Sequence, residues 1–176
     1  MLCFCRNDNF IWYRCKLYCR IHELFFEEMM TDKEKTYELL YKQVKSLIEG
    51  EQDEIAIMAN VAALIHETFH FWWTGFYRVM GQELVLGPFQ GPIACTRIAY
   101  GHGVCGTAWQ EKRSIVVPDV EQFKGHIACS SASKSEIVVP VWKNDEIVAV
   151  LDIDSEKLST FDDTDRIGLE KICTLL

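Results

Sequence analysis

The sequence predicts a single α+β domain, in which a central antiparallel sheet is flanked by N-terminal and C-terminal helices. Three observations lead to this prediction. The 176 residues are 49% hydrophobic and 25% charged, which is enough apolar material for one core of ordinary size. Long helical periodicity occurs only towards the two ends of the chain. Between these ends, short β-rich runs follow one another as in a meander, with short helices in the loops.

Two helices are expected before the sheet. The first starts at Thr31 with an acidic first turn, keeps apolar residues at three- and four-residue spacing as far as Ile48, and ends before Gly50. The second extends from about Asp53 to Phe69. It is so uniformly apolar that we expect it to pack on another helix and on the sheet, or in a dimer seam, which leaves a homodimer open. Both helices are interpreted as scaffold.

Six strands are expected between the helices. They cover residues 72–79, 83–86, 95–100, 114–117, 136–142 and 146–153. Turns at residues 80–82 and 143–145 join the first and the last pair as hairpins. A short helix is predicted over residues 104–112, and a second one follows Pro118.

The chain closes with a helix over residues 161–176, which Asp162 or Asp163 should cap. Its apolar face is expected to turn three residues inward: Ile167, Leu169 and Ile172. Cys173 lies on the same face, so we interpret it as a small core residue.

Residues 1–28 differ from the rest of the chain. They mix aromatic, cysteine and basic residues without a steady period, whereas a well-formed helix start follows Met29 and Met30. We therefore expect residues 1–28 to be an extension outside the fold, with the native start at one of these methionines and the domain over residues 30–176. The alternative is a genuine extension whose four cysteines have a metal or redox role: Cys3, Cys5, Cys15 and Cys19.

Composition limits the partners. A net charge of -8 provides no basic face for nucleic acid or for an anionic membrane surface. Basic residues interrupt every apolar run near the N-terminus before it reaches the length of a secretory leader, and no run approaches the ~20 residues of a membrane span. The expected compartment is the cytoplasm, where grouped cysteines more often indicate metal binding or catalysis than structural disulfides.

Three cysteines fall in three separate glycine-bearing loops. Cys95, Cys105 and Cys129 all have small neighbours in turn-rich segments, where a thiol can be reached. Cys105 is predicted at the start of a short helix, where the positive end of the helix dipole favours a thiolate. Zinc is an alternative, with His102 or His126 as a fourth ligand, but no two of these cysteines have the short Cys-x-x-Cys spacing of structural zinc sites.

Three carboxylates are expected beside these loops. Asp152 and Asp154 point to the same face of their strand, because side chains alternate along a strand. Glu136 opens the neighbouring strand and can therefore lie next to this pair, so that the three groups attract one cation at the mouth of a pocket. Alternatively, the aspartates only accept hydrogen bonds from loop amides, or the group binds a hard divalent ion, for which nearby thiols are poor ligands.

Several segments resemble one known family. They are Gly87–Gly91, Ala94–Cys95, Gly101–Ala108, Gly125–Cys129, Ser135–Pro140 and Leu151–Ser155. In order and spacing, from about Met30 to the C-terminus, the chain resembles the free methionine-(R)-sulfoxide reductases, enzymes built on a GAF domain. The resemblance implies a six-stranded antiparallel sheet between helices. It also implies an oxidoreductase that reduces free methionine-R-sulfoxide at the expense of thioredoxin, with no metal or other cofactor in the domain.

The resemblance also assigns roles to the cysteines. Cys129 resembles the attacking thiol, and Cys95 and Cys105 resemble resolving or relay thiols, although attack by the thiol at the Cys105 position remains open. Two positions depart from the family pattern. Trp72 stands where asparagine is usual, and Ser130 stands where aspartate is common.

The substrate-binding residues follow from the same resemblance and from the chemistry. Glu136, Asp152 and Asp154 resemble the family's substrate-binding carboxylates, and Trp73 and Tyr77 could form an aromatic wall for the substrate methyl group, whereas Phe76 is expected in the core.

Thiol chemistry accounts for the rest of the pattern. Thiolate attack on a sulfoxide needs a protonated acid near the leaving oxygen, and clustered carboxylates raise one another's proton affinity. The expected products are methionine and a cysteine sulfenic acid, which a second cysteine converts to a disulfide for thioredoxin to reduce. A non-catalytic GAF-type sensor would explain the pocket but not the three loop thiols. A redox-buffering or zinc-storing protein would rest on the N-terminal cysteines alone.

Overall fold

The computed structural model describes residues 30–125 and 132–176. The chain divides into two compact units, residues 1–36 and 37–176. In the first unit the structure describes only the start of helix α2 (Asp32–Leu47). Thr31 and Glu34 form a capping box there: the Glu34 amide donates to the Thr31 hydroxyl at 3.2 Å, and the Thr31 amide donates to the Glu34 carboxylate at 2.6 Å. The predictions about residues 1–28 lie outside the described residues.

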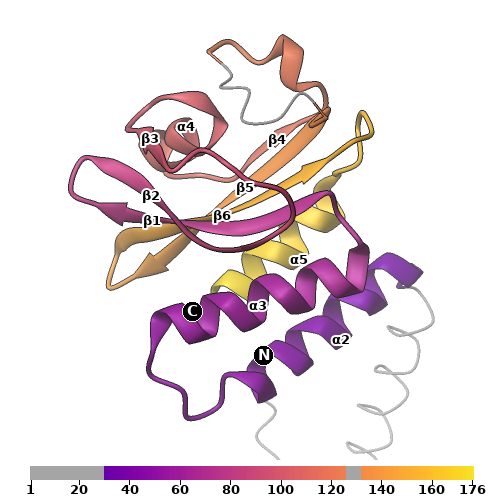
Figure 1. Cartoon of the computed structure of the whole chain (residues 1–176). Helices are drawn as coiled ribbons and strands as arrows, with labels where there is room; N and C mark the ends of the chain where they lie inside the picture. Colours follow the sequence, from indigo (N-terminus) through magenta and orange to yellow (C-terminus); the bar gives the residue numbers. More distant parts are fainter. Residues whose placement is uncertain (1–29, 126–131) are drawn as a thin grey trace, which may run out of the picture. The chain divides into compact units, whose positions relative to one another are not determined.

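The second unit is built on one six-stranded sheet (Figure 1). Its strand order is β3-β2-β1-β6-β5-β4, and every neighbouring pair is antiparallel, as predicted. The strands are β1 (Trp73–Met80), β2 (Glu83–Gln90), β3 (Arg97–Ala99), β4 (Ile115–Val117), β5 (Ser135–Lys143) and β6 (Glu146–Ser155). The β5–β6 hairpin turns at Asn144 and Asp145, whose positive φ angles of 52° and 63° suit the right-handed twist of the two strands.

Strand β2 is longer than predicted. It ends at Gln90 rather than at Leu86, so part of the first expected glycine loop is strand. The pairing with β1 shifts between Gly75 and Tyr77, and this irregularity lets a Gly-Pro pair pass without ending the ladder. Strand β3, by contrast, is shorter than the predicted residues 95–100.

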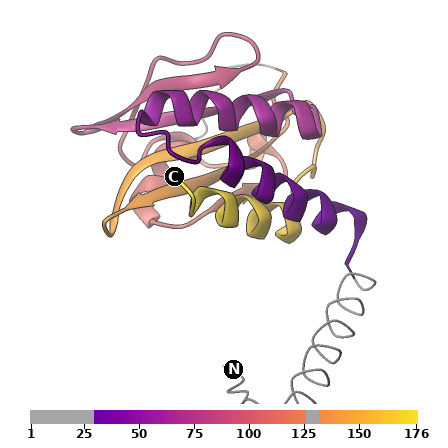
Figure 2. The same cartoon turned by 90° about the horizontal axis from the view of Figure 1, so that it is seen from below.

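Helices cover both faces of the sheet (Figures 1 and 2). One face carries α3 (Glu54–Phe69), α5 (Asp163–Cys173) and the part of α2 that begins at Tyr37; the other carries α4 (Gly103–Glu111), and the 3-10 turn η1 (Val120–Gln122) follows β4. Within the described residues, no helix combines the length and apolarity needed to span a bilayer.

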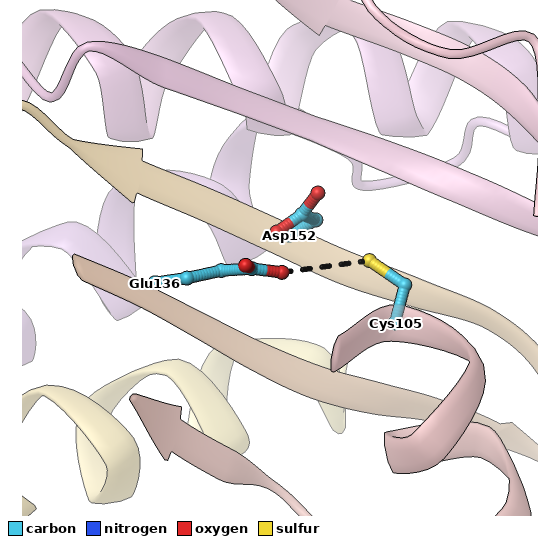
Figure 3. A group of neighbouring side chains, drawn as sticks. All are labelled: Cys105, Glu136 and Asp152. Carbon is cyan, nitrogen blue, oxygen red and sulfur yellow. Dashed lines mark hydrogen bonds between the residues drawn. The ribbon is translucent and has the colours of Figure 1, made fainter. Parts of the chain in front are cut away.

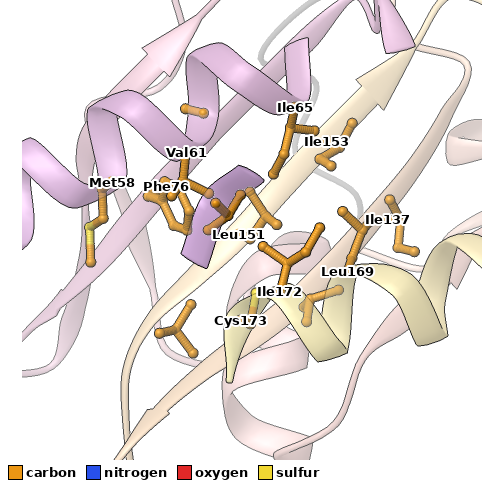
Figure 4. Close-up of a cluster of buried hydrophobic side chains, with 14 of the residues drawn as sticks. Met58, Val61, Ile65, Phe76, Ile137, Leu151, Ile153, Leu169, Ile172 and Cys173 are labelled. Carbon is orange, nitrogen blue, oxygen red and sulfur yellow. The ribbon is translucent and has the colours of Figure 1, made fainter. Parts of the chain in front are cut away.

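Side-chain alternation divides the interior into two clusters. Figure 4 shows the larger cluster, in which Phe76, Leu151 and Ile153 of the sheet pack against α3 and α5. The predicted core positions of Phe76 and Cys173 are confirmed. The second cluster lies on the α4 side of the sheet. It contains the residues of β1, β5 and β6 that alternate with those of the larger cluster, so their side chains face α4.

One inward-facing residue was predicted wrongly. Ile167 is 57% exposed, although Leu169 and Ile172 are fully buried. The buried stripe of α5 passes through Asp165 and Gly168, and Asp165 accepts a hydrogen bond from the Tyr37 hydroxyl at 2.8 Å. Ile167 lies about 100° around the helix from Gly168 and therefore faces away from the sheet.

Gly168 provides a test of this packing. A Cβ atom at Gly168 would overlap the buried ring of Tyr37. Replacing a helical glycine by alanine normally stabilises a protein by up to about 1 kcal/mol. Because the overlap outweighs this gain, we expect Gly168→Ala to lower the free energy of unfolding by about 2 kcal/mol, measured by urea denaturation. A variant as stable as the wild type would contradict the described contact between α2 and α5.

Candidate functional site

The register of β5 and β6 brings three carboxyl groups to one place. Glu136 lies directly opposite Asp154, and Asp152 lies two residues before Asp154 on the same face of β6. All three line a pocket on the α4 side of the sheet. The other lining residues are Trp72, Trp73, Tyr77, Pro92, Ile93, Ala94, Ile98, Gly103, Val104, Cys105 and Ser133. The predicted convergence of the three carboxylates is confirmed.

Helix α4 brings a thiol to the same pocket. The loop before this helix is closed by two hydrogen bonds, from the Gly101 amide to the Gly106 carbonyl and from the Gly106 amide to the His102 carbonyl, each 3.0 Å long. A Cβ at Gly106 would overlap the carbonyl oxygen of Ala99, so only glycine lets the helix start so close to β3. This packing fixes Cys105 in the first turn of α4, directed towards β5 and β6.

Cys105, Glu136 and Asp152 form a compact buried group (Figure 3). The Cys105 Sγ atom lies 4.0 Å from Oε1 of Glu136, and one ligand atom from each of the three residues lies within 4.8 Å of the others. Oδ1 of Asp152 is buried and has no hydrogen-bond partner among the described residues. A polar atom buried in this way gains free energy from any ligand that supplies a proton or a positive charge.

Burial changes the ionisation of the group. Burial, and then the neighbouring Asp152 and Asp154 carboxyls, raise the pKa of Glu136 well above its usual value. The pKa of Asp152 is also raised well above its usual value, by burial first and by Asp154 second. Burial raises the pKa of Asp154 to about 6, against the opposing hydrogen bond from the Ser133 hydroxyl. The pocket therefore contains carboxyl groups that hold their protons to a higher pH than exposed carboxyl groups do.

The thiolate predicted for Cys105 is not what this environment favours. Its position in the first turn of a helix is confirmed, but the side chain is only 3% exposed. Burial, followed by the charges of Asp152 and Glu136, raises the pKa of the Cys105 thiol well above its usual value. The sequence pattern indicated a helix dipole and an accessible thiol; burial among acids outweighs the dipole.

The raised carboxyl pKa values predict how the stability of the protein depends on pH. The folded state holds these protons more tightly than the unfolded state, so the contribution of each group to stability is complete below its unfolded pKa and is lost as the pH rises through its folded pKa. For Asp154 this window extends from about 3.8 to about 6. Between these pH values we expect the wild type to lose up to about 3 kcal/mol of unfolding free energy relative to Asp154→Asn.

Urea titrations of both proteins at pH 4, 5, 6 and 7 measure this difference. The comparison removes the contributions of the titrating groups that do not interact with Asp154, because the two proteins share them; Glu136 and Asp152, whose pKa values Asp154 raises, titrate differently in the variant. A difference that stays constant across the four pH values would contradict the raised pKa of Asp154 in the folded protein.

Two aromatic residues form the wall opposite α4. Trp73 stacks between Tyr77 and Phe89, at centroid distances of 5.9 Å and 5.4 Å, and its indole N–H donates to the Pro92 carbonyl at 3.1 Å. The Tyr77 hydroxyl donates to the Cys95 carbonyl at 3.0 Å and so connects β1 to the loop before β3. Both residues line the pocket as predicted, and both polar atoms are already engaged within the protein.

Known proteins with the same sequence pattern identify the family. A GAF domain model matches residues 51–176. GAF domain-containing protein A of Dictyostelium discoideum is 57% identical over 82% of the chain and 92% of its own length. Free methionine-R-sulfoxide reductase of Escherichia coli is 44% identical over 82% of the chain and 88% of its own length. The chain belongs to the free methionine-R-sulfoxide reductase family.

A solved structure agrees with this assignment. The free methionine-R-sulfoxide reductase of Neisseria meningitidis, in complex with its substrate, is 47% identical, covers 83% of this chain and 89% of its own, and superposes with a TM-score of 0.80. The predicted family, the GAF fold and the assignment as an oxidoreductase are confirmed.

The thiols that the family resemblance assigned are only partly described. Cys129 and His126 lie outside the described residues, and so do the four N-terminal cysteines. Cys95 is disulfide-bonded, and the other two described cysteines, Cys105 and Cys173, are free. The Cys105 thiol is therefore free beside the carboxyl groups while Cys95 is disulfide-bonded.

The zinc alternative drawn from the sequence is tested only in part, because Cys129 and His126 lie outside the described residues. Of the described residues, His102 caps the start of α4 through its backbone and is absent from the group that could hold a metal, as is Cys95. The group consists of one thiol and two carboxyls instead, since β5 and β6 rather than the loops supply the remaining side chains.

Two of the pocket residues that sequence reasoning did not assign to the site have polar side chains. Ser133, which precedes β5, donates a hydrogen bond to the Asp154 carboxylate. The pairing of Ser135 with Ser155 brings the start of β5 beside the end of β6, so a strand register would have indicated this contact. Trp72, the departure from the family pattern, also lines the pocket; its indole N–H is buried without a partner among the described residues.

Proposed function

We propose that this family member reduces free L-methionine-(R)-S-oxide to L-methionine with cysteine thiols as the immediate reductant. The observation that carries the proposal is the group of buried carboxyls beside thiol-bearing elements in one pocket. The relatives of E. coli and N. meningitidis support it, because both are named for this activity and the latter structure contains its substrate.

The carboxyls supply an acid and a cation site. Attack on the sulfoxide sulfur breaks the S–O bond only if the oxygen receives a proton as the bond weakens. Glu136 and Asp152, whose pKa values burial raises well above the usual range, can hold that proton at neutral pH. Asp154, with a pKa of about 6, is mostly ionised at pH 7 and suits the substrate's ammonium group.

Two thiols complete the cycle. The Cys129 thiolate attacks, the sulfoxide is reduced by two electrons, and the oxygen remains on Cys129 as a sulfenic acid while methionine leaves. The Cys95 thiol then condenses with the sulfenic acid, which releases water and forms a disulfide. The disulfide of Cys95 supports its role as the resolving thiol, and the raised pKa of the buried Cys105 thiol supports a relay role for Cys105 rather than attack.

Regeneration requires an external dithiol. A thioredoxin in the cytoplasm provides it by thiol–disulfide exchange, which leaves the enzyme with two free thiols and thioredoxin with a disulfide. Trp73 and Tyr77 hold the substrate's methyl group against the aromatic wall of the pocket.

The test is an assay with four substrates and a dithiol reductant. Methionine formation is measured from the R and the S sulfoxide, each as the free amino acid and inside a short peptide. We expect turnover of the free R epimer alone, because a pocket that binds free ammonium and carboxylate groups excludes a peptide. Equal rates on free and peptide-bound sulfoxide would contradict the proposal.

A further inference from the structure

Three residues of the pocket have the geometry of metal ligands. We propose that Cys105, Glu136 and Asp152 bind one zinc ion, with the fourth coordination position open to the pocket. Figure 3 shows the three side chains pointing toward one another from α4, β5 and β6. All three are buried, and their ligand atoms lie within 4.8 Å of one another.

The distances require only a small movement. Two ligands of a tetrahedral zinc ion, one thiolate at about 2.3 Å and one carboxylate oxygen at about 2.0 Å, lie about 3.5 Å apart. The Cys105 Sγ and Glu136 Oε1 atoms are already 4.0 Å apart. A contraction of about 1.5 Å or less in each distance brings the whole group to bonding distance, which small rotations of the side chains can supply.

The donor set selects the ion. One thiolate with two carboxylates is unsuitable for magnesium and calcium, which take oxygen ligands, whereas zinc accepts both sulfur and oxygen donors. A second observation points to a cation at this place. Oδ1 of Asp152 is buried and unpartnered among the described residues, and the Asp152 side chain is only 6% exposed. An ion would engage this oxygen and compensate the negative charge that its ligands acquire when they lose their protons.

The site has a consequence for the activity, and this part rests on the proposed function. Glu136 and Asp152 cannot bind zinc and act on the substrate at the same time. Zinc is therefore expected to inhibit competitively and reversibly, raising the apparent KM while a chelator restores the rate. Because Cys105 is free while Cys95 is in a disulfide, the proposed ligand thiol is present in the oxidised protein as well.

The experiment uses cobalt as a spectroscopic probe for zinc. The full chain carries serine in place of six cysteines, which leaves Cys105 and the core residue Cys173: the replaced residues are Cys3, Cys5, Cys15, Cys19, Cys95 and Cys129. Cobalt chloride is titrated into this protein, and zinc chloride then displaces it. We expect one equivalent of cobalt, with the near-ultraviolet band of a cobalt–thiolate bond.

Matched variants assign the ligands. Cys105→Ser should abolish the band, and Glu136→Gln and Asp152→Asn should each weaken zinc affinity at least about tenfold, since even partners outside the first coordination shell cost this much. Cys173→Ser is the control, because Cys173 lies in the core cluster on the other face of the sheet, outside the ligand group, and should change the affinity less than threefold. A band that survives Cys105→Ser, or an affinity unchanged by both carboxyl variants, would overturn the site.

Two further measurements keep the outcomes distinct. If the six-serine protein fails to fold, cobalt is added to the reduced wild type and to Cys105→Ser, and the difference between the two spectra is recorded. A difference spectrum without a cobalt–thiolate band overturns the proposal. Inhibition is measured separately, as the apparent KM for free methionine-R-sulfoxide with and without zinc. An inactive protein that shows the cobalt band refutes the proposed function but not the metal site.

Discussion

Replacing Cys129 by serine is expected to abolish methionine release even in a single turnover. In the proposed mechanism no other group can take the sulfoxide oxygen, because the Cys105 thiol is buried among acids and has a raised pKa. We expect the single-turnover rate to fall at least about a thousandfold, as is common when a catalytic nucleophile is removed. Rapid quenching of reduced protein with excess substrate, followed by methionine analysis, measures this rate.

Cys95→Ser separates attack from resolution. This variant should release about one equivalent of methionine per protein and then stop, since the sulfenic acid has no resolving thiol. A burst from Cys129→Ser that is absent from Cys105→Ser would reassign the attack to Cys105. Cys173→Ser is the control for removal of a thiol, because Cys173 lies in the core at the end of α5 and should affect stability alone.

Removing the buried acid should have the second large effect. Glu136→Gln and Asp152→Asn keep the size of each side chain but cannot deliver the proton to the sulfoxide oxygen. We expect each to lower kcat by about 100-fold or more, the usual scale for the loss of a positioned acid. Both positions are buried, and a neutral amide there avoids the cost of burying a charge, so thermal stability at pH 8 should stay equal or increase.

Activity and stability should therefore change in opposite directions in these variants. Parallel measurements of kcat and of the melting temperature at pH 8 distinguish this outcome from simple misfolding. A variant that loses stability and activity together would mean that the carboxyl serves the fold and not the reaction. Full activity in either variant would exclude that residue as the acid.

The carboxyl cluster was predictable from the sequence because it depends on local rules. Alternation along a strand places Asp152 and Asp154 on one face, and the tight turn at Asn144 and Asp145 fixes the neighbouring strand, which brings Glu136 beside them. These constraints act over a few residues and need no knowledge of the rest of the fold.

Features that depend on tertiary packing were not predictable in the same way. The burial of Cys105 follows from the close approach of Gly106 to Ala99, two residues from different elements. The exposure of Ile167 follows from the contact between Gly168 and Tyr37, which are far apart in the sequence. Neither distance between elements is visible in residue spacing, so the pattern alone indicated an accessible thiol and an inward-facing isoleucine.

The most direct test of the proposed thiol reaction is a single-turnover experiment without added reductant. Fully reduced protein is mixed with the R or the S epimer of free methionine sulfoxide. The amount of methionine released per protein is measured, and the disulfide-linked peptides of the protein are identified by mass spectrometry. We expect about one equivalent of methionine from the R epimer, none from the S epimer, and one new disulfide between Cys95 and Cys129. Methionine release from both epimers, or release without a new disulfide, would contradict the proposal that these thiols reduce the R epimer within the pocket.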